Sequence, residues 1–434
     1  MNHQAAPTTP AIQRWLNALA NDLDARKRDH LFRELSEVSS AQGAELVIGS
    51  KRYLQFCTNN YLGLAADPEV LDTARDAMDR WGFGSGASRL VAGSMQSHHE
   101  LEADLAQFKQ AQAALVFSSG YAANMAVLTC LTSPHDRIFS DKLNHASLLD
   151  AADASRCTHR TYHHKNYGRL AELLARRSHA EGQAVPHPTD AAPSASEAPA
   201  DAKAAEEMPH TWIVTDTVFS MDGDLADLRR LDCLAQTHGA LLVTDEAHAT
   251  GVLGPDGRGL AALQNVESAV AVSVGTLSKA LGSVGGFVTG PRQVIDTLIN
   301  RSRHFIYTTA LPAVCTAAAR CALNISRREP QRRQRVLTLA QHVRTELTAM
   351  GYQTGASESP IIPVMLGSAE HALAAAEALR DQGIYIPAIR PPTVAPNTAR
   401  LRISLMATHS DAHIEVLLGA MKVLRDRNLR PNLQ

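Results

Sequence analysis

Short apolar runs alternate with helical segments through the middle of the chain, and this alternation constrains the fold more than any other feature. The strands of a parallel sheet read as nearly continuous apolar runs because helices cover both of its faces. Strands that alternate with helices are typical of βαβ units. The pattern therefore predicts an α/β fold with a mostly parallel sheet. The predicted strands are 114–119, 137–141, 211–216, 240–246, 270–275 and 285–290.

The sheet accounts for only part of the 434 residues, so we predict more than one domain. Residues 1–60 should form a mixed-charge helix over 11–37 and two short strands, 61–300 a large α/β domain, and 301–434 a small C-terminal α+β domain. Residues 178–209 hold one valine and no aromatic residue. This composition predicts a flexible insertion, because too little apolar surface is available for burial.

The composition argues against several classes of partner. The net charge is −2, so we expect no nucleic acid. No apolar stretch approaches the roughly 18 residues of a membrane span, and the first ten residues do not resemble a secretory signal, so we expect no membrane. The six cysteines form no Cys-x-x-Cys pair. That pattern indicates reduced thiols in the cytoplasm and no metal site.

A lysine follows the predicted strand 270–275 in a loop of small and hydroxyl residues. Thr276 and Ser278 precede Lys279, and glycines come after it. A lysine amine is a useful nucleophile when it is held, partly desolvated, near a carbonyl group. Small residues with hydroxyl groups also suit phosphate binding. Taken alone, Lys279 could equally be an ordinary surface lysine.

Three further groups are expected at the same edge of the sheet. Asp245 ends a predicted strand, where ligands of open α/β sheets bind, and its carboxylate can keep a ring nitrogen protonated. His248 follows closely enough to reach the same ring. The helix after strand 114–119 begins near Gly120 and Tyr121, and its free N–H groups suit an anion. His145 can stack on an aromatic group and carry a proton. Each has a structural alternative, such as helix capping by Asp245.

Together these groups supply a lysine for an imine, a carboxylate for a pyridinium, a helix N-terminus for a phosphate and an aromatic base. These are the requirements of pyridoxal 5′-phosphate (PLP). Seven motifs also occur in the order typical of the α-oxoamine synthases, which the chain resembles from about residue 15 to its end, apart from the insertion. The motifs are TNNYLGL (58–64), GSGASRLVAG (84–93), SSGYAAN (118–124), NHASLLD (144–150), TDTVFSMDGD (215–224), DEAHATGVLG (245–254) and GTLSKALGSVGG (275–286).

The resemblance implies a fold-type I PLP-transferase with a seven-stranded, mostly parallel sheet between helices, and a homodimer with active sites between the subunits. Members of this family condense an amino acid with an acyl thioester and release CO₂. The Arg-Pro-Pro-Thr run within 388–409 is similar to the biotin-pathway branch, which uses L-alanine and pimeloyl-CoA or a pimeloyl-acyl carrier protein. Two alternatives stay open: a sister activity that uses glycine or serine, and a PLP-binding protein without catalysis.

The resemblance also implies a role for each matching residue. Lys279 should bond to the cofactor and act as the general base, Asp245 should pair with the ring nitrogen, and His145 should stack on the ring. The other cofactor contacts should come from Ser220 and His248 at the phenolic oxygen and from Gly120, Tyr121, Thr276 and Ser278 around the phosphate, with Thr308 or Thr309 entering from a second subunit. The substrate contacts should come from Arg33, Asn59, His145, Thr393 and Arg402, of which Arg402 should bind the amino-acid carboxylate.

Three positions depart from the family pattern. Asn60 and Tyr121 stand where Asp and Phe are common, and Asn397 stands where glycine is usual. Asparagine tolerates the left-handed conformation that glycine supplies. We therefore expect these changes to affect loop shape more than chemistry.

Overall fold

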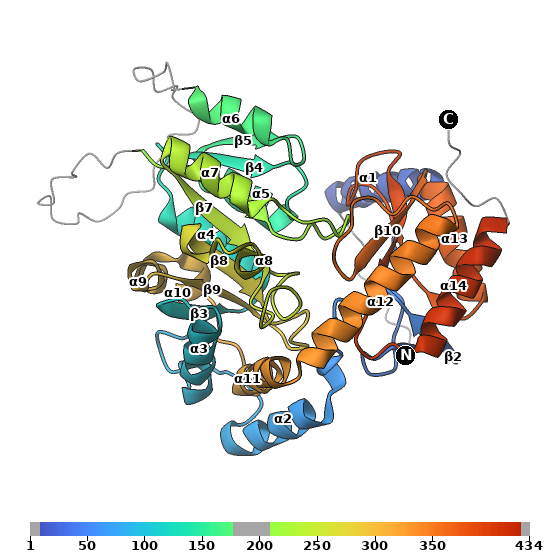
Figure 1. The fold of residues 1–434 in the computed structure, drawn as a ribbon, viewed down its shortest axis with the longest axis horizontal. Coiled ribbons are helices and arrows are strands. Elements are labelled where there is room, and N and C mark those ends of the chain that lie inside the picture. The colour runs from blue at the N-terminus through green and yellow to red at the C-terminus, as the bar shows by residue number, and fades with distance from the viewer. Residues whose placement is uncertain (1–8, 177–208, 427–434) are drawn as a thin grey trace, which may run out of the picture.

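The computed structural model describes residues 9–176 and 209–426 of the chain. A seven-stranded sheet lies at the centre of the larger part of the molecule (Figure 1). Its order is β3-β9-β8-β7-β6-β4-β5, and only β9 runs antiparallel to its neighbours. The predicted fold class is confirmed. The strands are β3 (Ala113–Phe117), β4 (Arg137–Asp141), β5 (Thr158–Tyr162), β6 (Thr211–Asp216), β7 (Ala240–Asp245), β8 (Val270–Thr276) and β9 (Gly286–Gly290).

The apolar runs did not predict β5. This strand lies at the edge of the sheet, and only Tyr162 among its five residues is buried. A strand whose face meets solvent needs no continuous apolar run.

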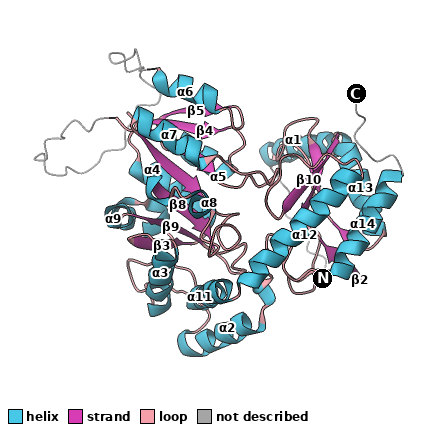
Figure 2. Cartoon of the chain, in the orientation of Figure 1, coloured by secondary structure: helices cyan, strands magenta, loops and turns pink. Residues whose placement is uncertain are grey.

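Helices cover both faces of this sheet, as Figure 2 shows. Successive side chains of a strand point to opposite faces, so Ile138 packs into one hydrophobic core and Phe139 into the other. One face is covered by α4 (Gly120–Leu131), α5 (Ala146–Ala154), α9 (Arg292–Arg301) and α10 (Arg303–Ile306). The other is covered by α3 (Gln96–Phe108), α6 (Tyr167–Ala175), α7 (Leu228–His238) and α8 (Leu260–Gln264).

The smaller part of the molecule joins both ends of the described chain. A three-stranded sheet has the order β10-β13-β12, and in a second one the N-terminal strands meet β11 in the order β1-β2-β11. The long helix α12 leads into this part from α11, which packs against α2 (Figure 1). The remaining elements are β1 (Glu45–Ile48), β2 (Lys51–Gln55), η1 (Leu64–Ala66), α2 (Pro68–Trp81), η2 (Glu267–Ala269), α11 (Ala313–Arg328), α12 (Pro330–Ala349), β10 (Ile361–Gly367), α13 (Ala369–Asp381), β11 (Ile384–Tyr385), β12 (Ala388–Ile389), β13 (Ala399–Ser404) and α14 (Asp411–Asp426).

The first helix is shorter than the sequence predicts. Helix α1 (Pro10–Arg28) stops well before residue 37, and His30 takes a positive φ of 58°. The Arg390 guanidinium donates to the carbonyl oxygens of His30 and Phe32. Contacts with the far end of the chain therefore replace helical hydrogen bonds in this segment.

The insertion at 178–209 lies outside the described residues except for Pro209, and the division at residues 60 and 300 stays a prediction. Within the described ranges, no helix is long and apolar enough to cross a membrane. The same ranges contain no group of three or more His, Cys, Asp or Glu side chains arranged to hold a metal ion.

Candidate functional site

The carboxyl ends of the central parallel strands bring most of the predicted site residues together. Strands β6 and β7 end at Asp216 and Asp245, which are direct register partners. Strand β8 ends at Thr276, three residues before Lys279. Open α/β sheets bind ligands at this edge because successive loops diverge there.

The Lys279 amine is held in a tightly shaped loop. The Thr276 hydroxyl donates to the Gly285 carbonyl oxygen over 2.8 Å and accepts from the Ser278 backbone N–H over 3.1 Å. Burial lowers the pKa of Lys279 to about 8, although Asp245 and Asp216 act in the opposite direction. A much larger fraction of this amine is therefore neutral near pH 8 than of an ordinary lysine.

Asp245 is buried and held by two donors. Its Oδ1 accepts from the Ala247 backbone N–H and its Oδ2 from the Asn124 side-chain amide, each over 2.7 Å. Burial and the neighbouring Asp245 raise the pKa of Asp216 well above its usual range. The strand ends thus bring together two carboxyl groups that resist ionising at the same time.

His145 precedes helix α5 and is fixed at both its backbone and its ring. Its backbone N–H donates to Asp216 Oδ2 over 2.7 Å, and its Nδ1 lies 2.7 Å from the Ser147 hydroxyl. Desolvation lowers the pKa of His145, Asp245 opposes that effect, and Lys279 adds to it. A neutral imidazole is the result.

A second cluster surrounds the buried side chain of Arg402. Its guanidinium donates to the Ser220 carbonyl oxygen, to Asn59 Oδ1 over 3.1 Å and to the Tyr61 hydroxyl over 3.4 Å. The Tyr61 hydroxyl also lies 2.7 Å from His248 Nδ1. Burial lowers the pKa of His248 well below its usual range, with Lys279 and Arg402 contributing.

Arg402 has no ion-pair partner among the described carboxylates. A buried guanidinium without an opposite charge is costly, and a bidentate anionic ligand compensates it. This arrangement can therefore bind a small carboxylate.

The N-terminus of α4 lies beside the lysine loop. A Cβ atom placed on Gly120 would come 3.5 Å from the Thr276 Cβ. Tyr121 is exposed, and its hydroxyl donates to Asp150 Oδ2 over 2.6 Å. The Ser278 hydroxyl bonds to Gly285 and so shapes the loop. The first turn of α4 therefore offers N–H groups of the kind that suit an anion.

Arg33 and Thr393 form a more exposed region. The Arg33 guanidinium donates to the Pro391 carbonyl oxygen over 3.0 Å, and the Thr393 N–H donates to the Arg390 carbonyl oxygen. The structure thus joins Arg33 to the segment that carries Thr393. Among the described residues, neither has a hydrogen bond to Arg402. Asn397 takes a positive φ of 60°, as expected of a residue that replaces glycine.

Sequence reasoning missed three residues that hold the site together: Tyr61, Asn124 and Asp216. All three belong to motifs quoted above, but their local sequence carries no sign of their contacts. Their partners are 187, 121 and 71 residues away along the chain. The one sequence signal that could have pointed to them is their position as polar residues within a few residues of a predicted site residue in the same motif.

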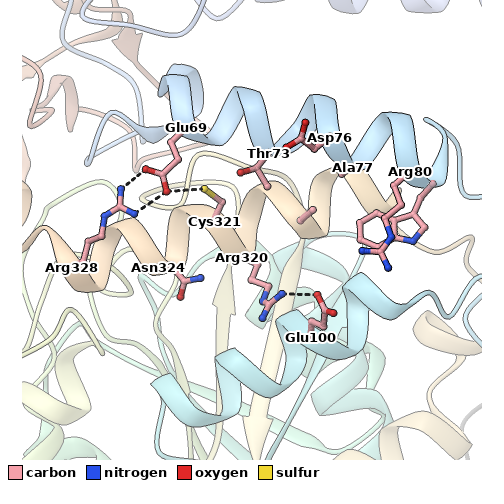
Figure 3. A pocket seen from close by; sticks show the side chains of 12 residues that line it. Glu69, Thr73, Asp76, Ala77, Arg80, Glu100, Arg320, Cys321, Asn324 and Arg328 are labelled. Atoms are coloured by element: carbon pink, nitrogen blue, oxygen red, sulfur yellow. Dashed lines mark hydrogen bonds and ion pairs between the residues drawn. The ribbon is translucent and has the colours of Figure 1, made fainter.

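A separate pocket lies between α2, α3 and α11, and Figure 3 shows its lining. Its two glutamates are paired with arginines. Arg328 bonds to Glu69, and Arg320 to Glu100. We assign no function to this pocket because these arginines are already engaged by glutamates.

Comparison with known proteins shows the family to which the chain belongs. Residues 51–421 match the family model described as aminotransferase class I and II. The 8-amino-7-oxononanoate synthase of Anaeromyxobacter dehalogenans strain 2CP-1 is 43% identical over 407 residues, which cover 94% of each chain.

Two solved structures show the same fold. A serine palmitoyltransferase from S. paucimobilis, solved with PLP-myriocin bound, superposes with a TM-score of 0.84 at 28% identity and covers 96% of this chain and 98% of that one. An 8-amino-7-oxononanoate synthase from Francisella tularensis superposes with a TM-score of 0.70 at 26% identity and covers 87% and 98%.

Proposed function

Because this chain belongs to the class I and II aminotransferase family, and within it to the 8-amino-7-oxononanoate synthases, we propose that it condenses L-alanine with a pimeloyl thioester. The products are 8-amino-7-oxononanoate, CO₂ and a free thiol, in biotin biosynthesis. The observation that carries the proposal is 43% identity over 94% of both chains.

The residues at the sheet edge fit PLP as the cofactor. A lysine with a lowered pKa, a buried carboxylate and a helix N-terminus lie at this edge of the sheet, and these are the groups that PLP requires. When bound, PLP supplies an aldehyde that bonds to an amine and a ring that accepts electrons. Lys279 would hold the aldehyde carbon, Asp245 would keep the ring nitrogen protonated, and the first turn of α4 would bind the phosphate.

The remaining roles follow from position. Arg402 would bind the carboxylate of alanine as a fork, which fits its lack of a protein carboxylate partner. Lys279 would then take the proton from the alanine Cα and later return one to the product. His145 lies over the same edge and would hold a proton near the carboxylate that is lost as CO₂.

Four further groups complete the proposed site. Ser220 and His248 would donate to the phenolic oxygen of the cofactor. Arg33 and Thr393 would bind the acyl substrate from the exposed side, because Arg33 bonds to the Pro391 carbonyl oxygen and Thr393 follows two residues later.

The acyl donor and the assembly are proposals of the same kind. We propose pimeloyl-CoA or a pimeloyl-acyl carrier protein as the donor, a homodimer as the assembly and the cytoplasm as the compartment. Helix α1 supports the homodimer because it has no buried residue and exposes an apolar stripe of Ile12, Trp15, Leu16, Leu19 and Leu23. Six free cysteines support a reducing compartment.

The test is product mass. PLP-loaded protein is incubated with pimeloyl-CoA and, in separate tubes, with L-alanine, glycine or L-serine. A decarboxylated adduct of alanine as the main product supports the proposal. A product with only glycine or serine would replace it with a sister activity. If no tube gives product, the assay is repeated with pimeloyl-acyl carrier protein, and failure there too rejects the proposed reaction.

A further inference from the structure

A continuous line of hydrogen bonds connects Asp245 to the ring of His145. The Asn124 Nδ2 donates to Asp245 Oδ2 over 2.7 Å and to the Ser147 hydroxyl oxygen over 2.9 Å. The Ser147 hydroxyl lies 2.7 Å from His145 Nδ1. Asn124 and Ser147 are each 1% exposed, so water does not compete for these bonds. The line joins β7, α4 and α5.

The direction of each bond is fixed by what its groups can donate. The Nδ2 of an amide only donates, and an ionised carboxylate only accepts, so Asn124 must present Nδ2 and not Oδ1 to Asp245. The same Nδ2 gives its second hydrogen to the Ser147 oxygen. The Ser147 hydroxyl hydrogen is then available for His145 Nδ1.

A second donor converges on the same ring nitrogen. The backbone N–H of Ser147 points to His145 Nδ1 over 3.2 Å, and a backbone N–H cannot accept. Nδ1 must therefore present its lone pair. A neutral histidine with a lone pair on Nδ1 carries its proton on Nε2.

We propose that Asn124 and Ser147 are positioning residues that keep His145 neutral with its proton on Nε2, and that orient Asp245 at the same time. This rests on the proposed function, in which His145 holds a proton near the departing carboxylate. A proton cannot be added at Nδ1 without losing both Ser147 donors. His145 therefore delivers its proton from Nε2 only.

Charged groups on several elements face this imidazole and bear on its proton. Asp245 on β7 and Asp150 on α5 favour protonation, and Lys279 opposes it. Asp216 on β6 accepts from the His145 backbone N–H and so fixes the backbone from which the ring extends. These charges bear on whether the ring is protonated. The two Ser147 donors contact Nδ1 itself and therefore determine which of the two nitrogens carries the proton of the neutral ring.

The direct test is the tautomer, measured by NMR of protein with ¹⁵N-labelled histidine, without PLP and without substrate. The His145 signals are identified as those missing from the spectrum of His145→Gln. We expect a neutral ring with an unprotonated Nδ1 in the wild-type protein. A proton on Nδ1, or a charged ring at pH 7, overturns the proposal. No variant needs to retain activity for this measurement.

Variants test the two positioning residues separately. Ser147→Ala removes the hydroxyl donor to His145 Nδ1 and leaves the backbone N–H. We expect a mixture of tautomers and a roughly tenfold lower kcat with little change in the KM for alanine. The matched control is Ser155→Ala, which removes a buried hydroxyl bonded to the Ala152 carbonyl on the same helix. Equal behaviour of the two alanine variants would contradict a positioning role for Ser147.

Asn124→Ala tests the other end of the line. We expect weaker binding of PLP, measured by equilibrium dialysis, because Asp245 keeps only its contact with the Ala247 N–H. Thr129→Ala on the same helix removes a hydroxyl bond to the Met125 carbonyl and is the control. Unchanged PLP affinity in Asn124→Ala would remove Asn124 from the proposal. The tautomer result stands whatever product the enzyme makes, so the two proposals fail separately.

Discussion

The sheet edge around Lys279 and the exposed segment around Arg33 show two different ways of holding functional groups. At the sheet edge, Asp245 and Arg402 are buried and hydrogen-bonded to other side chains. On the exposed segment, Arg33 and Arg390 instead donate to backbone carbonyl oxygens of each other's chain segments. In the first region, the functional side chains are held in fixed positions by other side chains. The second depends on two distant stretches of chain staying together.

The largest expected effect is at Lys279. Lys279→Ala removes the proposed cofactor anchor and general base, and we expect kcat to fall by at least about a thousandfold. The thermal midpoint should change little in the protein without PLP, because a partly buried amine is removed and not a hydrophobic group. Steady-state rates and melting curves check this, with the exposed Lys142→Ala as control. Retained turnover would remove Lys279 from the mechanism.

A smaller loss is expected at Arg402. Arg402→Lys keeps the charge but loses the fork that binds a carboxylate in two places. We expect the KM for alanine to rise by about 10- to 100-fold, corresponding to about 1.5–3 kcal/mol of charge-assisted hydrogen bonding. The KM for the acyl thioester should change less. If the thioester KM rises instead, Arg402 belongs to the other substrate.

The exposed segment should respond in the opposite sense. Arg33→Ala should raise the KM for the pimeloyl thioester several-fold and leave the KM for alanine unchanged, because Arg33 bonds to the segment that carries Thr393 and has no hydrogen bond to Arg402. Arg390→Ala should do the same and also lower the free energy of unfolding by about 1–3 kcal/mol, because the buried Arg390 guanidinium is lost as the donor to the carbonyl oxygens of His30 and Phe32. Titrating each substrate separately and unfolding both variants in urea measures these effects. Equal unfolding free energies of the two variants would contradict the predicted structural role of Arg390.

The smallest effect concerns pH. Burial lowers the pKa of His164, but hydrogen bonds with Asp141 and Asp224 outweigh it and raise the pKa to about 9. A histidine whose folded pKa is raised stabilises the protein fully below its unfolded pKa near 6.5, and this contribution is lost as pH rises through about 9. We expect a loss on the order of 1–2 kcal/mol between these values. His164→Gln should flatten the curve of unfolding free energy against pH, and an unchanged curve would contradict the account.

The same contrast explains what could be predicted from the sequence. Lys279 and Asp245 could be placed because Asp245 ends one buried strand and Lys279 follows closely after another, and strand ends meet at one edge of a parallel sheet. Strand β5 could not, because it is a polar edge strand. The end of α1 could not either, because Arg390 bonds to His30 and Phe32 from about 360 residues away. Local pattern carries no information on such contacts.

Asn124 and Tyr61 illustrate the remaining gap within the site itself. Both lie in recognised motifs, yet their roles arise only when other strands and helices bring Asp245 and His248 to them. Sequence reasoning finds groups with intrinsic chemistry, such as an amine or a carboxylate. It does not find the amide or hydroxyl that orients them.

The central claim, that the Lys279 edge of the sheet is the PLP site, has one direct measurement. Protein loaded with PLP is treated with borohydride, which makes the bond between the lysine and the cofactor permanent, and the digest is mapped by mass spectrometry. The account predicts the added mass on the peptide that contains Lys279 and on no other lysine peptide. The added mass on a different lysine, with the Lys279 peptide unmodified, would contradict it.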